Sequence, residues 1–290
     1  MSSEHAFFPH VGFVGLGLMG GSLAQLIKQA HPETKISVFE KNPESVTYAT
    51  INNIADKGCT SIDQFPKALD LVFICTPLPD ILPSVEAISA HIEGPTIITD
   101  IGSVKKRVAE NVRLSKPDHI FIAGHPLAGS EKQGIQFAHS SILQHSPYIL
   151  IENSTHEFLR FKAYLSKLSF DVITMTADAH DRWISMASHF PYLMACLTTS
   201  VIRRGAATDP SSLQRVAGPG LRDTSRVAES SPDWGAAICQ ENKENIQASL
   251  SLLTSELQTL QTLLESDDET GLHDYFGSAQ AFRKFLFPHA

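Results

Sequence analysis

The chain has 290 residues, 42% of them hydrophobic and 19% charged, so it is long enough for two domains with buried cores. Its formal net charge of -8 argues against nucleic acid as a partner, because phosphate backbones bind basic surfaces. No apolar run reaches the roughly 18 residues that span a bilayer, and the first residues lack a secretion signal, so we expect neither membrane nor export. The four cysteines form no CxxC pair, which indicates reduced thiols in a cytoplasmic protein.

The first predicted elements are a strand, a glycine-rich turn and a helix within residues 11–27, VGFVGLGLMGGSLAQLI. In the G-x-G-x-x-G spacing, the first glycine permits a tight turn and the second lets a pyrophosphate approach the backbone. The third lets the helix pack on the strand, and the helix N-terminus attracts the phosphates. The predicted dinucleotide-binding residues of this turn are Gly15, Gly17, Leu18, Met19 and Gly20.

A second predicted strand, residues 35–39, ends at Glu40. A carboxylate at this position accepts the ribose hydroxyls of NAD and repels the 2′-phosphate of NADP. We therefore expect NAD as the cofactor, although the adjacent Lys41 weakens this preference.

Further apolar runs that read as strands alternate with helical segments up to residue 176. This alternation predicts an α/β fold with a mostly parallel, doubly wound sheet of the Rossmann type. The runs lie at 69–75, 95–99, 119–123, 148–151 and 171–175.

Helical spacing replaces the strands beyond that point, with predicted helices at 181–202, 234–264 and 275–285. We therefore expect a Rossmann-type domain at residues 1–176 and an all-helical domain at 177–290. Because leucines recur along 234–264, the helical domain is expected to pair with a second copy in a homodimer.

Polar residues follow three of the predicted strands, where ligands of open α/β sheets bind. We expect Thr76, Pro77 and Asp100 near the cofactor, and Ser103 and His125 near its reactive end. A histidine suits the general base because its ordinary pKa lies close to neutrality. The alternative, that His125 is a structural turn residue, stays open.

A segment with glycines and two arginines, residues 217–230, interrupts the helical half. Arg222 and Arg226 are candidate carboxylate anchors, because a guanidinium forms two parallel hydrogen bonds to a carboxylate. The alternative is a solvated loop with surface charges.

Five motifs occur in order along most of the chain: GLGLMGGSLA, DIGSVK, GHPLAGSE, AHDRWISMASHFPY and GLRDTSRVAESSPDW. Together they resemble the prephenate/arogenate dehydrogenase family of tyrosine biosynthesis. The resemblance implies a Rossmann-type domain, a helical dimerisation domain and oxidative decarboxylation of a cyclohexadiene with NAD or NADP.

The resemblance also implies roles for individual residues. His125 matches the general base, Ser103 the hydroxyl that holds the ring hydroxyl group, and Arg226 the carboxylate-binding arginine. Three more match residues of the substrate pocket, and Arg222 becomes a secondary candidate. These three are Glu131, His180 and His189.

One position departs from the family pattern. Where many members read SHLPH, this chain reads SHFPY, so Tyr192 replaces a histidine that contacts the substrate side chain. Losing this cationic ring while keeping Glu131 favours the ammonium of arogenate over the pyruvyl group of prephenate.

Two other functions compete with this interpretation. β-Hydroxyacid and 6-phosphogluconate-type dehydrogenases use a lysine on the first helix of the helical domain, but residues 178–202 contain none. A non-catalytic NAD-binding sensor needs neither a base nor an anchor arginine. No metal is implied, because the histidines lack a clustered ligand spacing.

Overall fold

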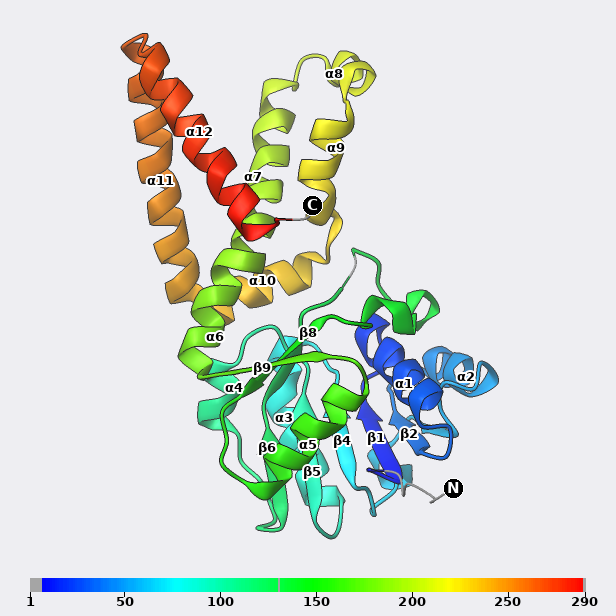
Figure 1. Ribbon diagram of the computed structural model, residues 1–290. Helices are drawn as coiled ribbons and strands as arrows, with labels where there is room; N and C mark the ends of the chain where they lie inside the picture. Colours follow the sequence, from blue (N-terminus) through cyan, green and yellow to red (C-terminus); the bar gives the residue numbers. More distant parts are fainter. Residues whose placement is uncertain (1–6, 130, 289–290) are drawn as a thin grey trace. The chain divides into compact units, whose positions relative to one another are not determined.

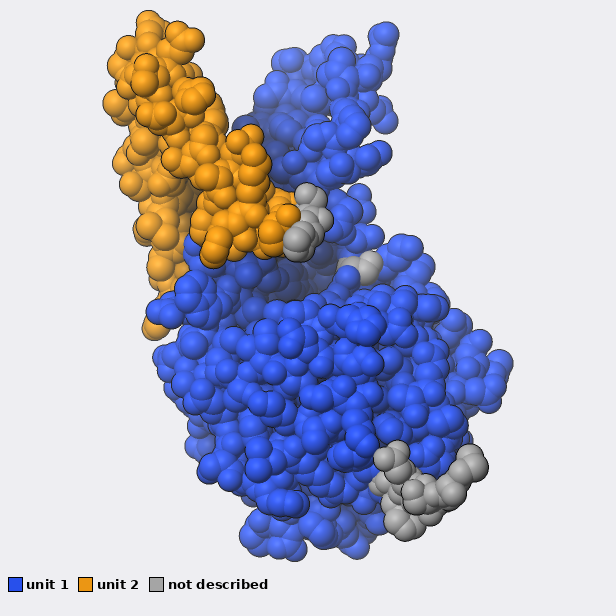
Figure 2. All heavy atoms as spheres, in the orientation of Figure 1, with its two compact units in different colours: residues 1–243 blue, residues 244–290 orange. Residues whose placement is uncertain are grey.

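The computed structural model describes residues 7–129 and 131–288. It divides into two compact units, Met1–Lys243 and Glu244–Ala290, which Figure 2 colours separately. The domain boundary that the sequence predicts near residue 176 stays a prediction.

The first unit is built on a six-stranded, fully parallel sheet with the strand order β3-β2-β1-β4-β5-β6. The order reverses between β1 and β4, and ligands of doubly wound sheets bind at this switch point. The predicted Rossmann-type sheet is confirmed. Its strands are β1 His10–Val14, β2 Lys35–Phe39, β3 Lys57–Cys59, β4 Leu71–Ile74, β5 Thr96–Asp100 and β6 His119–Ile122.

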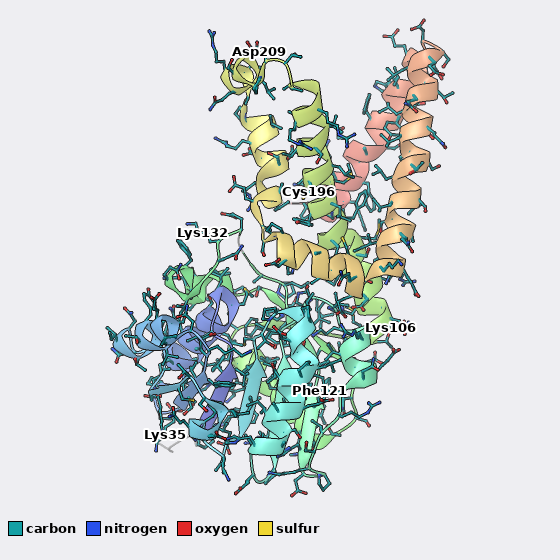
Figure 3. The ribbon with its side chains drawn as sticks, turned by 180° about the vertical axis from the view of Figure 1, so that it is seen from behind. Lys35, Lys106, Phe121, Lys132, Cys196 and Asp209 are labelled. Atoms are coloured by element: carbon teal, nitrogen blue, oxygen red, sulfur yellow. The ribbon has the colours of Figure 1, made fainter. Side chains whose placement is uncertain are left out.

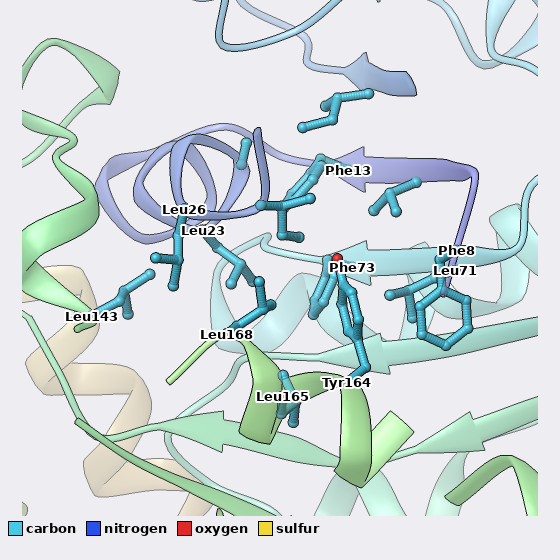
Figure 4. Packing of buried hydrophobic residues seen from close by; sticks show 14 of the residues in the cluster. Phe8, Phe13, Leu23, Leu26, Leu71, Phe73, Leu143, Tyr164, Leu165 and Leu168 are labelled. Carbon is cyan, nitrogen blue, oxygen red and sulfur yellow. The ribbon is translucent and has the colours of Figure 1, made fainter. Parts of the chain in front are cut away.

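Helices cover both faces of this sheet (Figure 1). On one face, Phe13 and Phe73 stack at 5.2 Å and pack with Leu23 of α1 (Figure 4). Phe161 of α5 belongs to the same cluster. On the other, strand residues pack against α3 and α4. Burial on both faces explains why the strands are almost continuously apolar. The helices of this region are α1 Leu18–Ala30, α2 Pro43–Ile51, α3 Ile81–His91, α4 Lys106–Asn111 and α5 His156–Lys167.

A second, three-stranded sheet has the order β7-β8-β9, with β7 antiparallel to β8. Its strands are β7 Gly124–Pro126, β8 Pro147–Ile151 and β9 Asp171–Met175. The apolar runs at 148–151 and 171–175 therefore belong to this small sheet and not to the main one. It matters for the site because β7 carries His125, which pairs in register with Ile149.

A long helical segment follows β9 and is interrupted where a single helix over 181–202 was predicted. The chain forms one turn of π-helix, Ser185–His189, between α6 and α7. Pro191, in the first turn of α7, has no N–H to donate, which breaks the regular hydrogen-bond ladder there. The remaining helices of the first unit are α6 Ala177–Ile184, α7 Phe190–Gly205, α8 Pro210–Val216, α9 Pro219–Ser225 and α10 Pro232–Glu241.

Two other predictions about this half were wrong in detail. The segment 217–230 is not an irregular loop, because it holds α9 and a 3-10 turn, Arg226–Glu229. The single helix predicted over 234–264 breaks at Asn242, whose backbone leaves the helical region at φ -116 and ψ 34.

The second unit consists of α11 Lys243–Glu265, apart from its first residue, and α12 Glu269–Leu286. Asp268 caps α12 by accepting from the Gly271 N–H. Leu257 and Leu264 of the predicted leucine stripe remain 53% and 57% exposed. Among the described residues, no helix is both long and apolar enough to cross a membrane.

Candidate active site

The glycine turn between β1 and α1 has the geometry that the motif predicts. Gly15 has a φ of +85, and a Cβ there would lie 2.9 Å from the Cys75 carbonyl oxygen. A Cβ on Gly20 would lie 3.0 Å from the Gly15 oxygen, so helix and strand approach closely there. A Cβ on Gly17, by contrast, would meet nothing within 4 Å. The fold itself therefore requires glycine at positions 15 and 20, whereas Gly17 faces open space.

The first turn of α1 offers its backbone and not its side chains to a ligand. Leu18 is buried, and Met19 packs against the main core. Gly17 occupies the N-cap position and supplies no capping side chain. The N-terminus of α1 therefore presents N–H groups and the positive end of its dipole.

Glu40 lies at the carboxyl end of β2, beside this turn. Its Oε2 accepts from the Leu16 N–H at 2.7 Å, and its Oε1 accepts from the Asn42 N–H at 2.9 Å. These two bonds hold the carboxylate in a fixed orientation while its remaining lone pairs stay available. The residue is half-buried.

The residues after β4 and β5 differ in exposure. Pro77 is exposed, and Thr76 is half-buried with its Oγ1 3.4 Å from Ser84 Oγ. Asp100, however, is 0% exposed. Its carboxylate pairs with the Lys105 ammonium and accepts from the Gly102 N–H. Asp100 thus lies inside the protein.

Lys105 was not predicted as a site residue, although it ends the DIGSVK motif. It is fully buried, and its Nζ also donates to the Gly124 carbonyl at 2.8 Å, next to His125. Burial lowers the pKa of Lys105, while the Asp100 carboxylate opposes this shift. The buried pair ties the end of β5 to the start of β7.

His125 is 8% exposed and belongs to a chain of hydrogen bonds that reaches α6. Its Nδ1 lies 2.9 Å from His180 Nε2, and His180 Nδ1 lies 2.7 Å from Asp181 Oδ1. Asp181 also accepts from two backbone N–H groups, Lys105 at 2.7 Å and Lys106 at 3.0 Å. Figure 3 labels Lys106 at the start of α4. Both His180 and Asp181 are buried.

Burial dominates the electrostatics of these rings. It holds the pKa of His125 well below 6.5, with further lowering by His180, Lys105 and His189. Burial also lowers the pKa of His180, against which the hydrogen bond to Asp181 acts. At neutral pH His125 is therefore a neutral imidazole able to accept a proton.

Asn242 links the break before α11 to this cluster. Its Nδ2 donates to the Asp181 carbonyl at 2.8 Å and lies 3.2 Å from His189 Nδ1. His189 is fully buried, and burial lowers its pKa to about 4. Two buried polar atoms, His189 Nε2 and Ser103 Oγ, make no hydrogen bond to any described residue.

Two predicted pocket residues pair with each other. Arg226 Nη1 donates to Glu131 Oε2 at 2.7 Å, with side-chain exposures of 58% and 24%. A backbone hydrogen bond and the Arg226 guanidinium hold the pKa of Glu131 below its usual value. Arg222 bonds instead to its neighbour Asp223 and is 75% exposed.

Tyr192 lies in a small apolar cluster with Val104 and Ile238. Its ring packs edge-on against Trp234 at 5.0 Å, and its hydroxyl lies against Gly235. Burial and the Cys196 thiol raise the pKa of Tyr192 to about 12, so the phenol is neutral.

A glycine turn at the switch point of a Rossmann-type sheet, together with a buried neutral histidine, defines a dinucleotide-dependent oxidoreductase. Two family models match this chain, the nucleotide-binding domain of prephenate dehydrogenase at residues 23–169 and its dimerization domain at residues 176–278. The chain belongs to the prephenate dehydrogenase family, which confirms the resemblance seen in the motifs.

Individual relatives agree with this assignment. The chain is 30% identical to prephenate dehydrogenase of Bacillus subtilis, over 94% of this chain and 74% of that one. It is 28% identical to cyclohexadienyl dehydrogenase of Zymomonas mobilis, over 96% of each.

Solved structures also match along nearly the whole chain. Prephenate dehydrogenase from A. aeolicus in complex with hydroxyphenyl propionate and NAD+ matches at a TM-score of 0.87 and 28% identity, over 98% of this chain and 100% of that one. Synechocystis arogenate dehydrogenase matches at 0.76 and 25%, over 96% and 99%. Family membership decides against the β-hydroxyacid dehydrogenase and the non-catalytic sensor. The roles of the individual site residues stay predictions.

Proposed function

We propose that this chain catalyses the NAD-dependent oxidative decarboxylation of prephenate or arogenate, which gives 4-hydroxyphenylpyruvate or tyrosine. The observation that carries the proposal is His125, a neutral and nearly buried imidazole just beyond the carboxyl ends of the main sheet. His125 accepts the proton of the substrate's ring hydroxyl as C4 loses a hydride. The ring carboxylate then leaves as carbon dioxide and the ring becomes aromatic.

The residues of the glycine turn fit NAD. The open space at Gly17 and the uncapped N-terminus of α1 suit a pyrophosphate. Glu40, held by two backbone N–H groups, suits the ribose hydroxyls. When bound, NAD supplies the hydride acceptor. Asp100 is fully buried and paired with Lys105, so we propose that it stabilises the start of β7 and does not contact the cofactor.

Ser103 and Arg226 have the chemistry for holding the substrate. The Ser103 hydroxyl has no partner among the described residues and suits a hydrogen bond to the ring hydroxyl group. The Arg226 guanidinium uses Nη1 for Glu131, which leaves further N–H donors for a substrate carboxylate. Before the substrate binds, Glu131 holds the Arg226 side chain in one orientation.

The test is NADH formation by the purified protein with NAD, offered prephenate and arogenate in parallel and then NADP in place of NAD. Turnover of either diene supports the proposal, and Glu40 leads us to expect NAD to be used better than NADP. No turnover of either diene with either cofactor contradicts it.

For the substrate side chain we propose that arogenate is accepted at least as well as prephenate. Tyr192 is neutral and turned into an apolar cluster, so it offers no positive charge to the second carboxylate of prephenate. Glu131 offers a negative charge that suits the ammonium of arogenate. A kcat/KM ratio that favours prephenate by more than about tenfold, which corresponds to 1.4 kcal/mol, would contradict this preference.

We propose a homodimer as the active assembly. Large apolar side chains of α11 and α12 are exposed, among them Leu252 at 60% and Phe282 at 61%. Together with the match to a dimerization domain, such a surface supports pairing with a second copy. Leu252→Glu should lower the mass measured by sedimentation, whereas Ile51→Glu, on α2 and 73% exposed, should leave it unchanged.

A further inference from the structure

We propose that Asp181 and His180 are positioning residues that fix the ring tautomer of His125, so that Nε2 is its proton-accepting nitrogen. The inference rests on the proposed function, because it explains how the base of that reaction is kept ready. It gives His180 a different role from contact with the substrate. Asp181, which lies in the AHDRWISMASHFPY motif, and Asn242, which lies in none of the five motifs, were not predicted as site residues.

The tautomer of His180 follows from its partner. Asp181 accepts on both carboxylate oxygens, and Oδ1 already accepts from the Lys105 N–H at 2.7 Å. An ionised carboxylate has no proton to donate, so His180 must donate its Nδ1–H across the 2.7 Å to Asp181. In a neutral ring this leaves His180 Nε2 without a proton, as an acceptor.

The tautomer of His125 follows in turn. Its Nδ1 lies 2.9 Å from His180 Nε2, and a bond between two ring nitrogens needs one proton. Because His180 accepts there, His125 donates its Nδ1–H. The second nitrogen of His125, Nε2, then carries the free lone pair, because the only hydrogen bond of this ring to a described residue is the one through Nδ1.

The same chain stabilises the product of proton transfer. Once Nε2 has accepted a proton, the positive ring of His125 still donates to a neutral acceptor, behind which lies the Asp181 carboxylate. The charged or titratable groups that face His125 are His180, Lys105 and His189, and each of them disfavours a positive ring when it is itself charged. A neutral His180 that accepts through Nε2 adds no charge and gives the positive ring an acceptor, which partly offsets this unfavourable environment.

Asn242 fixes the neighbouring ring by the same logic. Nδ2 of Asn242 lies 2.8 Å from the Asp181 carbonyl oxygen, which can only accept, so this atom is the amide nitrogen and a donor. It therefore also donates to His189 Nδ1 at 3.2 Å. His189 then carries its proton on Nε2 and is a neutral donor, not a second acceptor competing for the proton of His125.

The first experiment reads the tautomers directly in the wild-type protein. Long-range 15N–1H correlation spectra of histidine-labelled protein distinguish a protonated nitrogen from a bare one, and spectra of His125→Gln and His180→Gln assign the two rings. We expect both rings to be protonated on Nδ1 and bare on Nε2. A His125 ring protonated on Nε2 overturns the proposal, whether or not the protein turns over either diene.

The second experiment asks whether the arrangement matters for turnover. His180→Leu removes the acceptor and should lower kcat about 10- to 100-fold, the usual cost of losing a partner that orients a functional histidine. His180→Gln keeps an amide oxygen as acceptor and should recover most of this loss. KM for the diene and Kd for NAD should change less than threefold in both.

His119→Leu and His119→Gln are the matched controls, because His119 is another buried histidine bonded through Nδ1, here to Ser89. Neither should change kcat. Equal loss in His180→Leu and His180→Gln, or a loss seen mainly in KM, overturns the proposal. A wild-type protein that turns over neither diene contradicts the proposed function alone, because the spectra still test the predicted tautomers of His125 and His180.

Discussion

The glycine turn and the histidine chain lie in the same compact unit but are built in opposite ways. The histidine chain is the set of hydrogen-bonded side chains His125, His180 and Asp181, together with Asn242 and His189 beside them. The turn is a backbone site, in which Gly17 faces open space and α1 has no capping side chain. The histidine chain is a side-chain site whose rings are buried and bonded to one another. A backbone site needs only a local spacing of glycines, whereas a buried polar chain needs several distant segments to meet.

The two regions should therefore respond differently to substitution. Changes in the histidine chain should alter the rate and the stability, because His125 Nδ1, both ring nitrogens of His180 and the Asp181 carboxylate all have buried partners. Changes at the open part of the turn should alter binding and leave the fold intact.

The largest effect is expected at the base. His125→Gln should lower kcat about 10²- to 10⁴-fold, the usual contribution of a general base, because glutamine cannot accept a proton at neutral pH. NAD affinity, measured by fluorescence titration, should stay within threefold of wild type. His145→Gln, at an exposed histidine, is the control and should be fully active. Retained turnover in His125→Gln would remove His125 from its proposed role.

The buried ion pair behind the base should be nearly as sensitive, but in stability. Lys105→Met leaves the Asp100 carboxylate buried without its partner and should destabilise the protein by about 3–5 kcal/mol. The matched control is Lys67→Met, which breaks an exposed pair with Glu93 and should leave the unfolding midpoint nearly unchanged. Urea unfolding midpoints compare the two. Equal midpoints would mean that the buried pair contributes no more than a surface one.

The glycine turn was predictable because everything it needs lies within one strand, one turn and one helix. Gly15 and Gly20 have the close contacts that the spacing implies, and Glu40 ends the next strand as expected. The apolar runs predicted the strands of the parallel sheet. They did not predict that the last strands form a separate small sheet, because the hydrophobic period and the length of a run do not show which strand it pairs with.

The histidine chain could be predicted only in part. His125 was predicted as a site residue from its position after a strand, but its hydrogen-bond partner His180 lies 55 residues further along the chain. Asp181 meets Lys105 across 76 residues and Asn242 across 61. Tertiary contacts of this kind have no local periodicity, so neither the DIGSVK motif that Lys105 ends nor the residue type of Asn242 indicated which distant groups they contact. The helix break at Asn242 was missed for the same reason.

Acid should weaken the histidine chain specifically. The pKa of His189 is about 4 in the folded protein against 6.5 for an ordinary histidine. The unfolded chain therefore binds the proton first as pH falls, and stability present at pH 7 is lost below about 6.5. Between pH 6.5 and 5 this ring alone accounts for a loss of about 2 kcal/mol. Thermal unfolding should show a clearly lower Tm at pH 5.

His189→Gln should make this pH dependence shallower by about one proton, whereas His273→Gln, at a ring 88% exposed, should leave it unchanged. A Tm that is the same at pH 7 and pH 5 in the wild type would contradict the neutral, buried state of the ring.

The smallest effect is expected at the open glycine. Gly17→Ala adds a methyl group that meets nothing in the protein, so the Tm should stay within a degree or two of wild type. The same methyl group occupies the space where a pyrophosphate approaches α1, so Kd for NAD should rise about tenfold, or 1.4 kcal/mol. Gly94→Ala is the converse control, because its φ of +79 is strained for alanine although its surroundings are also open. It should cost about 1–2 kcal/mol of stability and leave NAD binding unchanged. If Gly17→Ala lowered the Tm as much as Gly94→Ala and left Kd unchanged, Gly17 would serve the fold and not the ligand.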